Sequence, residues 1–169
     1  FIEYGHLDQL AQVMAEKIKD SDISFDIIFG PAYKGIFLAS VLATKLNKPV
    51  CFNRKEEKDH GEGGSLIGAK PEGRVLIVDD VISSGLAIRE ALEILKPYDV
   101  EIAGVLVTLD RQEKGQKSDL MASAELKSEG IDVFEIISLD GLLDAGNIIS
   151  EDDIVRIKDY REQFRGKDA

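Results

Sequence analysis

Tryptophan is absent from this chain of 169 residues, cysteine occurs once, and proline occurs only four times. The single cysteine, Cys51, cannot form an internal disulfide, which excludes the disulfide-rich secreted scaffolds. It lies between Val50 and Phe52 in a predicted strand, and this position favours a buried structural thiol over a reactive nucleophile. We expect no signal peptide or transit segment and therefore a cytoplasmic protein.

Long apolar runs and an excess of positive charge are also missing. A membrane-spanning helix needs about 20 apolar residues, whereas the runs here are only a few residues long, so we expect no membrane partner. The chain has 21 lysines and arginines against 32 aspartates and glutamates, a net charge of −11. Binding to nucleic acid draws on clustered cations, so we also expect no nucleic-acid partner. The composition predicts one globular domain over residues 1–169.

Hydrophobic periodicity alternates between helical and strand-like along the chain. Apolar residues from Leu7 to Ile18 recur at intervals of three and four and predict a helix over 7–20. The apolar run 75–78 predicts a buried strand that ends before two aspartates. Between Asn53 and Arg74 we expect no helix or strand. The other predicted strands are 25–29, 49–52, 101–109 and 133–138, and the other predicted helices are 36–46, 86–95, 119–129 and an exposed 151–164.

This alternation predicts an α/β fold with a mostly parallel sheet flanked by helices on both faces. Ligands of such sheets bind outside the carboxyl ends of the strands. The segments that follow the predicted strands therefore form the candidate site, and they are residues 31–35, 53–64, 79–85 and 110–113.

The segment 79–85 places two aspartates before a Ser-Ser-Gly turn and a helix. Backbone N–H groups converge in such a turn, and the helix N-terminus adds about half a positive charge, so the turn suits a phosphate group. The carboxylates of Asp79 and Asp80 suit sugar hydroxyls and a developing cation on a sugar ring. The alternative is that an aspartate merely caps the turn. The segment matches neither a Walker A loop nor the Gly-x-Gly-x-x-Gly pattern.

The stretch 53–64 combines charged residues with glycine. A long stretch without secondary structure in a compact domain is typical of a functional lid or of disorder, and glycine permits large backbone excursions. Arg54, Lys55, Lys58 and His60 would close onto a polyanion and exclude water from it. The alternative is a solvated charged surface. The other histidine, His6, is expected to have no role in the site.

Four segments carry a resemblance to a known family. Residues 75–85 resemble the phosphoribosyl-diphosphate signature of the type I phosphoribosyltransferases, and residues 52–63 resemble the catalytic loop of the orotate phosphoribosyltransferase subfamily. Residues 29–35 resemble the family's pyrophosphate-binding loop, and residues 110–113 resemble a segment whose arginine contacts the orotate carboxylate. The resemblance extends over nearly the whole chain and implies a Rossmann-like fold with a lid at about 53–68.

The resemblance also implies an activity, namely transfer of the 5-phosphoribosyl group from 5-phosphoribosyl 1-diphosphate to orotate in pyrimidine biosynthesis. It implies Mg²⁺ held by substrate oxygens with no direct protein ligand, and a homodimer in which each lid closes over the neighbouring site. The catalytic residues would be Lys55, Lys58, His60, Asp79 and Asp80. Phosphoribosyl diphosphate would be bound by these five with Tyr33, Lys34, Arg54, Val81, Ile82, Ser83, Ser84, Gly85, Leu86 and Ala87, and orotate by Ser83 and Arg111.

The chain departs from the family pattern in two places. Leu86 stands where family members commonly have a threonine, so we expect Ser84 or backbone N–H groups to replace that phosphate contact. The family's N-terminal subdomain should precede Phe1 and is expected to be missing here. Three alternatives remain: Arg111 forms only a surface ion pair with Asp110 or Glu113; the enzyme acts on a purine or uracil; or the chain is a non-catalytic sensor of phosphoribosyl diphosphate.

Overall fold

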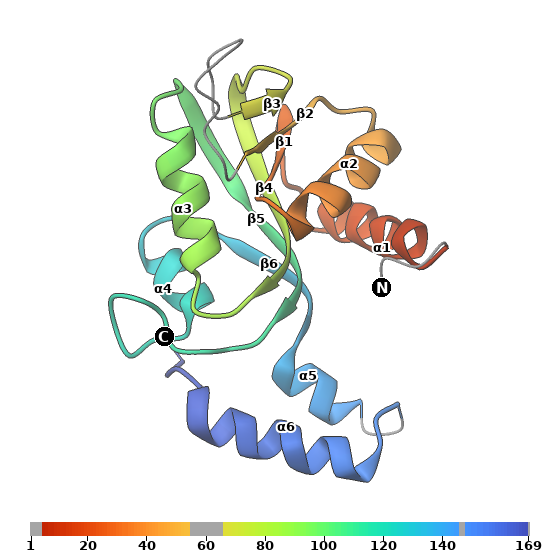
Figure 1. Ribbon diagram of the computed structural model, residues 1–169, viewed down its shortest axis with the longest axis vertical. Helices are drawn as coiled ribbons and strands as arrows, with labels where there is room; N and C mark the ends of the chain where they lie inside the picture. The colour runs from red at the N-terminus through yellow and green to blue at the C-terminus, as the bar shows by residue number, and fades with distance from the viewer. Residues whose placement is uncertain (1–4, 55–65, 146–147, 169) are drawn as a thin grey trace.

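The computed structural model describes residues 5–54, 66–145 and 148–168 (Figure 1). The strands are β1 (Ile27–Gly30), β2 (Val50–Asn53), β3 (Leu66–Gly68), β4 (Gly73–Ile82), β5 (Val100–Asp110) and β6 (Val133–Ser138). The helices are α1 (His6–Asp20), α2 (Lys34–Leu46), α3 (Leu86–Leu95), α4 (Ala122–Ser128), α5 (Leu139–Asp144) and α6 (Glu151–Phe164). In the described part of the chain, no helix is both long and apolar enough to cross a membrane.

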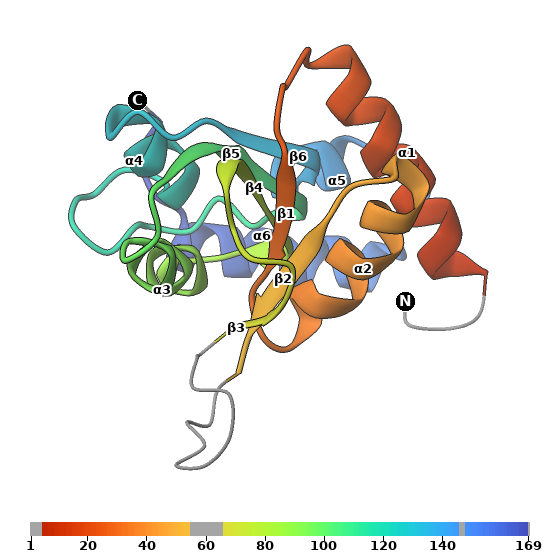
Figure 2. The same cartoon turned by 90° about the horizontal axis from the view of Figure 1, so that it is seen from above.

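The six strands form one sheet in the order β3-β2-β1-β4-β5-β6. All neighbouring pairs are parallel except β2 and β3, which are antiparallel. Parallel neighbours require crossover connections, and the helices that make them cover both faces of the sheet. Figure 2 shows α1 and α2 on one face and α3 and α4 on the other. The mostly parallel α/β sheet is thereby confirmed.

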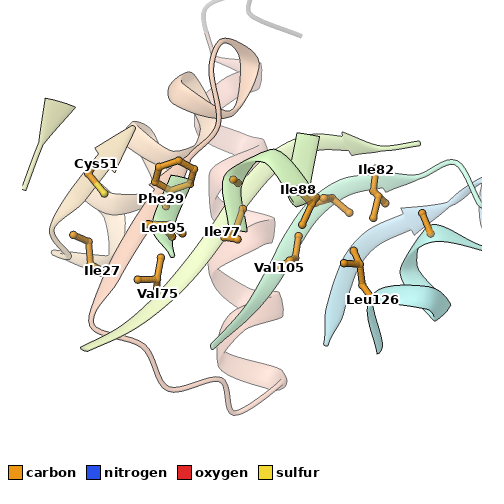
Figure 3. Packing of buried hydrophobic residues seen from close by; sticks show 13 residues of the cluster. Ile27, Phe29, Cys51, Val75, Ile77, Ile82, Ile88, Leu95, Val105 and Leu126 are labelled. Atoms are coloured by element: carbon orange, nitrogen blue, oxygen red, sulfur yellow. The ribbon is translucent and has the colours of Figure 1, made fainter. Parts of the chain in front are cut away.

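Alternate residues of the central strands pack into two separate cores. Ile27 and Phe29 of β1, with Val75 and Ile77 of β4, face α3 and α4 (Figure 3). Ile28, Leu76 and Val78, on the opposite face, pack against α1 and α2. Burying an aliphatic side chain of this size stabilises the fold by about 2 kcal/mol. Strands buried on both sides therefore hold their carboxyl ends in a rigid row.

Cys51 lies in the first of these cores (Figure 3). Its side chain is fully buried, and burial raises the pKa of the thiol to about 11. The thiol therefore stays protonated at neutral pH and cannot act as a thiolate nucleophile. The expectation of a buried structural cysteine is confirmed.

The prediction that β4 ends at residue 78 is wrong. The strand continues through both aspartates to Ile82, because it remains paired with β5, from Asp79 opposite Val107 to Ile82 opposite Asp110. Asp79 and Asp80 therefore lie within the strand rather than directly after its end. The turn itself is limited to residues 83–85.

The prediction that no strand lies between Asn53 and Arg74 is also wrong. β3 is antiparallel to β2, with Cys51 opposite Gly68. Gly68 has a φ of +103°, and a Cβ atom there would lie 2.4 Å from the Val50 carbonyl oxygen. Asn53 and residues 66–68, at the two ends of the lid predicted at about 53–68, therefore belong to strands. Residues 55–65 lie outside the described residues.

Two further differences concern the C-terminal half. α4 begins at Ala122 rather than 119, because Leu120 and Met121 form β-bridges with Lys167 and Lys114. The short helix α5 was not predicted, since its six residues are too few for a periodic pattern. α6 has no buried residue, as expected of an exposed helix. It lies with α5 beyond the end of the sheet (Figure 1).

Candidate active site

The described parts of the four segments predicted to form the site converge at the carboxyl edge of the sheet. Each one contacts another through a hydrogen bond or an ion pair. The contacts are Ala32 N to Asn53 Oδ1 at 2.8 Å, Lys34 Nζ to Asp80 Oδ2 at 3.1 Å, and Arg111 N to the Ile82 carbonyl oxygen at 3.0 Å. The turn after β1 is thus bonded to the end of β2 and to β4, and β4 is bonded to the segment after β5.

Asp79 and Asp80 form a buried pair of carboxylates, each only 6% exposed. The Asp80 N–H donates to Asp79 Oδ1 at 2.8 Å, and the Thr108 hydroxyl donates to the Asp80 carbonyl oxygen. Burial raises the pKa of Asp79 to about 7; the neighbouring Asp80 charge adds to this effect, while the Asp80 N–H and Lys34 oppose it. Asp79 therefore holds its proton to a higher pH than an ordinary aspartate does, and carboxyls with a raised pKa cluster at functional sites.

Gly35 lets the turn after β1 approach β4 closely. A Cβ atom there would lie 2.8 Å from the Val78 carbonyl oxygen and 3.2 Å from Asp79 Oδ1. Because a side chain does not fit, Gly35 fixes Lys34 beside the aspartates. Lys34 is 69% exposed, so its ammonium group can reach an anion in front of the pair. Tyr33 is exposed and precedes it.

The N-terminus of α3 is a second candidate subsite. Gly85 precedes the helix with a left-handed φ of 80°, and no side chain caps the helix. The N–H groups of the first turn lack intrahelical partners, and together with the helix dipole they favour an anion. Ser83 and Ser84 are half-buried, while Leu86 and Ala87 are exposed at this end.

The remaining residues predicted to form the site differ in their burial and in their distance from the aspartates. Val81 is half-buried, and Ile82 is buried in the core beside α3, so only its backbone can face a ligand. Arg54 is exposed and lines a hollow of about 680 Å³ with Asn53, Leu86 and Ala87, and the aspartates are not part of this lining. Lys55, Lys58 and His60 lie outside the described residues. Among the described residues, no group of three or more His, Cys, Asp or Glu could hold a metal ion.

Arg111 makes the ion pair with Glu113 that was considered as an alternative to a binding role. Its Nε atom lies 2.8 Å from Glu113 Oε1. It also donates to the Tyr160 hydroxyl and stacks on that ring at 4.8 Å. Asp110 instead accepts hydrogen bonds from Gln112 N and from Ser123 Oγ.

Sequence reasoning missed the contributions of Asn53, Thr108 and Tyr160. The role of Asn53 is a side-chain contact to the backbone of Ala32, which no spacing pattern reveals. A weak signal existed for Tyr160, because it and Phe164 are the aromatic residues of a largely charged helix and lie four positions apart. Their ring centroids are 4.7 Å apart.

Comparison with known proteins agrees with this geometry. Residues 4–138 match the phosphoribosyl transferase domain family. Orotate phosphoribosyltransferase of Laribacter hongkongensis is 49% identical over 163 residues, which span 92% of this chain and 76% of that protein. The chain belongs to the orotate phosphoribosyltransferase family. The Vibrio cholerae relative is 46% identical over 94% of this chain and 78% of its own length.

Solved orotate phosphoribosyltransferases share the fold. The Francisella tularensis structure has a TM-score of 0.77 and 33% identity, covering 98% of this chain and 83% of its own. An adenine phosphoribosyltransferase from Thermoanaerobacter pseudethanolicus has a TM-score of 0.56 at 18% identity over 77% of this chain and 78% of its own, a likeness of fold alone. The chain is therefore placed within the orotate branch by sequence and not only by its sheet.

Proposed function

We propose that this chain is a cytoplasmic enzyme that transfers the 5-phosphoribosyl group of 5-phosphoribosyl 1-diphosphate to orotate, giving orotidine 5′-phosphate and pyrophosphate. The observation that carries the proposal is the arrangement of three groups at one edge of the sheet. The uncapped N-terminus of α3 suits a phosphate, the buried Asp79–Asp80 pair suits sugar hydroxyls, and the exposed Lys34 suits a second anion beside them. A phosphorylated sugar diphosphate presents these three chemistries in one molecule.

In the proposed mechanism, the 5′-phosphate lies on residues 83–87, and Asp79 and Asp80 accept hydrogen bonds from the ribose hydroxyls. Lys34 neutralises the pyrophosphate together with Arg54 and the lid residues Lys55, Lys58 and His60. As the bond to pyrophosphate breaks, the anomeric carbon becomes cation-like, and the carboxylates stabilise that charge. Arg111 and Ser83 place orotate for attack. Positioning and charge stabilisation suffice, without a covalent protein nucleophile.

Magnesium is part of the proposal as a substrate-bound ion. Mg²⁺ favours oxygen ligands and retains several waters, and the carboxylates of Asp79 and Asp80 are oxygen groups beside the proposed ribose position. The ion, held chiefly by diphosphate and ribose oxygens, would neutralise charge on the leaving pyrophosphate. The protein residues then need only orient the hydrated complex.

The direct test is an assay of pyrophosphate release with the purified protein, using orotate, uracil, hypoxanthine and adenine in parallel. We expect turnover with orotate and a kcat/KM at least about 100-fold lower for the other bases, because a site built to pair a substrate carboxylate discriminates strongly against bases that lack one. Turnover with another base but not with orotate would overturn the proposal. Absence of turnover with all four, alongside binding of phosphoribosyl diphosphate, would favour a sensor.

We also propose a homodimer in which the lid of one subunit completes the site of the other.

Two variants, each inactive as a homodimer, test this proposal. Lys55→Ala should inactivate the lid, and Asp80→Asn should inactivate the carboxylate pair. Mixing the two variants should restore activity to about one quarter of the native level, since random exchange gives one native site in half of the dimers. Mixing Asp80→Asn with Asp79→Asn, both altered on β4, is the control that should restore none. No recovery in the first mixture, with subunit exchange verified by mass spectrometry, would exclude lid sharing.

A further inference from the structure

Arg111 is held by a closed network of three side chains. Its Nε–H pairs with Glu113 Oε1 at 2.8 Å, and its Nη2 donates to the Tyr160 hydroxyl. The Tyr160 hydroxyl in turn donates to Glu113 Oε1. The guanidinium also stacks on the Tyr160 ring at 4.8 Å. Two hydrogen bonds and a cation–π contact together hold the guanidinium group in position.

This network leaves some N–H groups of the Arg111 guanidinium free to bind a ligand. An arginine has five N–H donors, of which the network uses one on Nε and one on Nη2. In the described part of the structure, Nη1 has no hydrogen-bond partner, and the Arg111 side chain is 37% exposed. The Nη1 and Nη2 atoms together offer the parallel pair of N–H groups that binds a carboxylate in bidentate fashion.

The network joins the site to the C-terminal part of the chain. Tyr160 lies on α6, and the backbone after that helix pairs with the segment after Arg111. Lys114 N donates to the Phe164 carbonyl oxygen and Gly166 N to that of Gln112, each at 3.0 Å. A Cβ atom at Gly166 would lie 2.4 Å from Met121 N, so the close approach requires glycine. α6 is therefore a fixed support for Arg111.

Ion pairs also fasten α6 to α5. Asp140 lies 2.6 Å from Arg161 Nε and 2.6 Å from Arg165 Nη1. A small apolar hollow of about 290 Å³ lies between the two helices, lined by Leu109, Arg111, Leu139, Arg156, Ile157 and Tyr160. Arg111 thus lies between the candidate site and the pair of helices α5 and α6.

We propose that Tyr160 is a positioning residue that orients Arg111 for the carboxylate of the acceptor base, and thereby sets selectivity for that base. The proposal rests on the proposed function. Tyr160 acts through Arg111 and contributes to recognition of orotate rather than to binding of the phosphoribosyl diphosphate. Its hydroxyl and its ring both contact the guanidinium and hold it in place.

The test measures steady-state kinetics of Tyr160→Phe and Tyr160→Leu in the full-length protein. Tyr160→Leu removes the hydroxyl and the ring, so we expect the KM for orotate to rise about 10-fold, the range in which loss of hydrogen bonds to a charged group falls. Tyr160→Phe keeps the stacked ring and should give a smaller rise. The KM for phosphoribosyl diphosphate should stay within about twofold of native in both, because Arg111 orients only the base.

The matched control is Tyr98→Leu. Tyr98 follows α3 at the opposite end of the sheet, where its carbonyl accepts a hydrogen bond from Val100 N, and this variant should leave the KM for orotate unchanged. Equal loss of kcat with both substrates' KM values unaltered in the Tyr160 variants would assign Tyr160 a purely structural role and overturn the proposal. An unchanged KM for orotate in Tyr160→Phe and Tyr160→Leu would also overturn it. If the native protein does not use orotate at all, the proposed function itself fails.

Discussion

Replacing Asp79 with asparagine is expected to stabilise the ligand-free protein at pH 8 and to remove most of its activity. Burial raises the pKa of Asp79 to about 7, from an ordinary value near 3.8. Between these two values the unfolded chain loses the proton that the folded chain retains, so the free energy of unfolding falls as pH rises from about 4 to 7. Asparagine cannot ionise, and its Oδ1 atom can still accept the Asp80 N–H. The cost of holding a buried carboxylate therefore disappears in the variant.

We expect the variant to gain about 2 kcal/mol in free energy of unfolding over native protein at pH 8, and little at pH 4. Its kcat/KM should fall on the order of 100-fold, because a neutral amide cannot stabilise a cation-like sugar. Urea denaturation at several pH values and the pyrophosphate assay measure the two effects. The control is Asp99→Asn, an exposed aspartate before β5. Equal stability of native and Asp79→Asn proteins at pH 8 would contradict the argument.

Replacing Glu125 with glutamine is expected to be the most destabilising of these polar substitutions. Glu125 is 3% exposed and accepts hydrogen bonds from Ser118 Oγ at 2.7 Å, Lys117 N at 3.0 Å and Gln116 N at 3.1 Å, and pairs with Arg89 Nη2 at 2.5 Å. Removing its charge leaves the half-buried Arg89 guanidinium without its closest partner and turns one acceptor oxygen into a donor. We expect the free energy of unfolding to fall by about 3 kcal/mol.

The Glu125 carboxylate is also expected to make the free energy of unfolding depend on pH. Burial alone would raise the pKa of Glu125, but hydrogen bonds from Ser118, Arg89 and the Lys117 N–H outweigh burial and lower it to about 2. Its stabilisation is therefore complete above the ordinary value near 4.5 and is lost as pH falls toward 2, with a total of about 2 to 3 kcal/mol. Glu125→Gln should lack this component of acid unfolding.

Glu129→Gln is the matched control for Glu125→Gln. Glu129 pairs with the same Arg89 at 2.9 Å, but its side chain is 32% exposed. Exposed ion pairs contribute little, so we expect a loss of about 1 kcal/mol or less. Urea denaturation of both variants between pH 2.5 and pH 7 measures the comparison. Equal destabilisation by the two substitutions would show that burial of Glu125 is not the cause.

Most of the sheet could be predicted because its strands are buried on both faces. Residues such as Val75–Val78 in β4 form apolar runs that no exposed segment would tolerate. Strands could not be predicted where they depend on pairing with a distant strand rather than on the hydrophobic pattern of their own residues. β3 has only three residues and exists through its ladder with β2, and β4 extends through two aspartates because β5 pairs with them.

The site could be predicted to the level of segments rather than contacts. Topology places the residues after parallel strands together, and this sufficed to bring Lys34 next to Asp80. The residues that were missed act across elements distant in sequence. Tyr160 lies 49 positions from Arg111, and its polar contacts depend on how α6 returns to the sheet. The hydrophobic periodicity of an exposed helix does not indicate where that helix packs against the rest of the chain.

The backbone pairing of residues 164–167 with the segment after Arg111 has a consequence for synthesis on the ribosome. β1, β2 and β4, with the turn at 83–85, are made early and can pair while the chain is still growing. The loop from Gln112 to Met121 cannot reach its final hydrogen bonding until Lys167 has emerged, because Lys167 N and its carbonyl oxygen bond to Asp119 and Met121. The pair Asp79–Asp80 and the turn at 83–85 can thus form before the segment that follows Arg111 reaches its final backbone contacts.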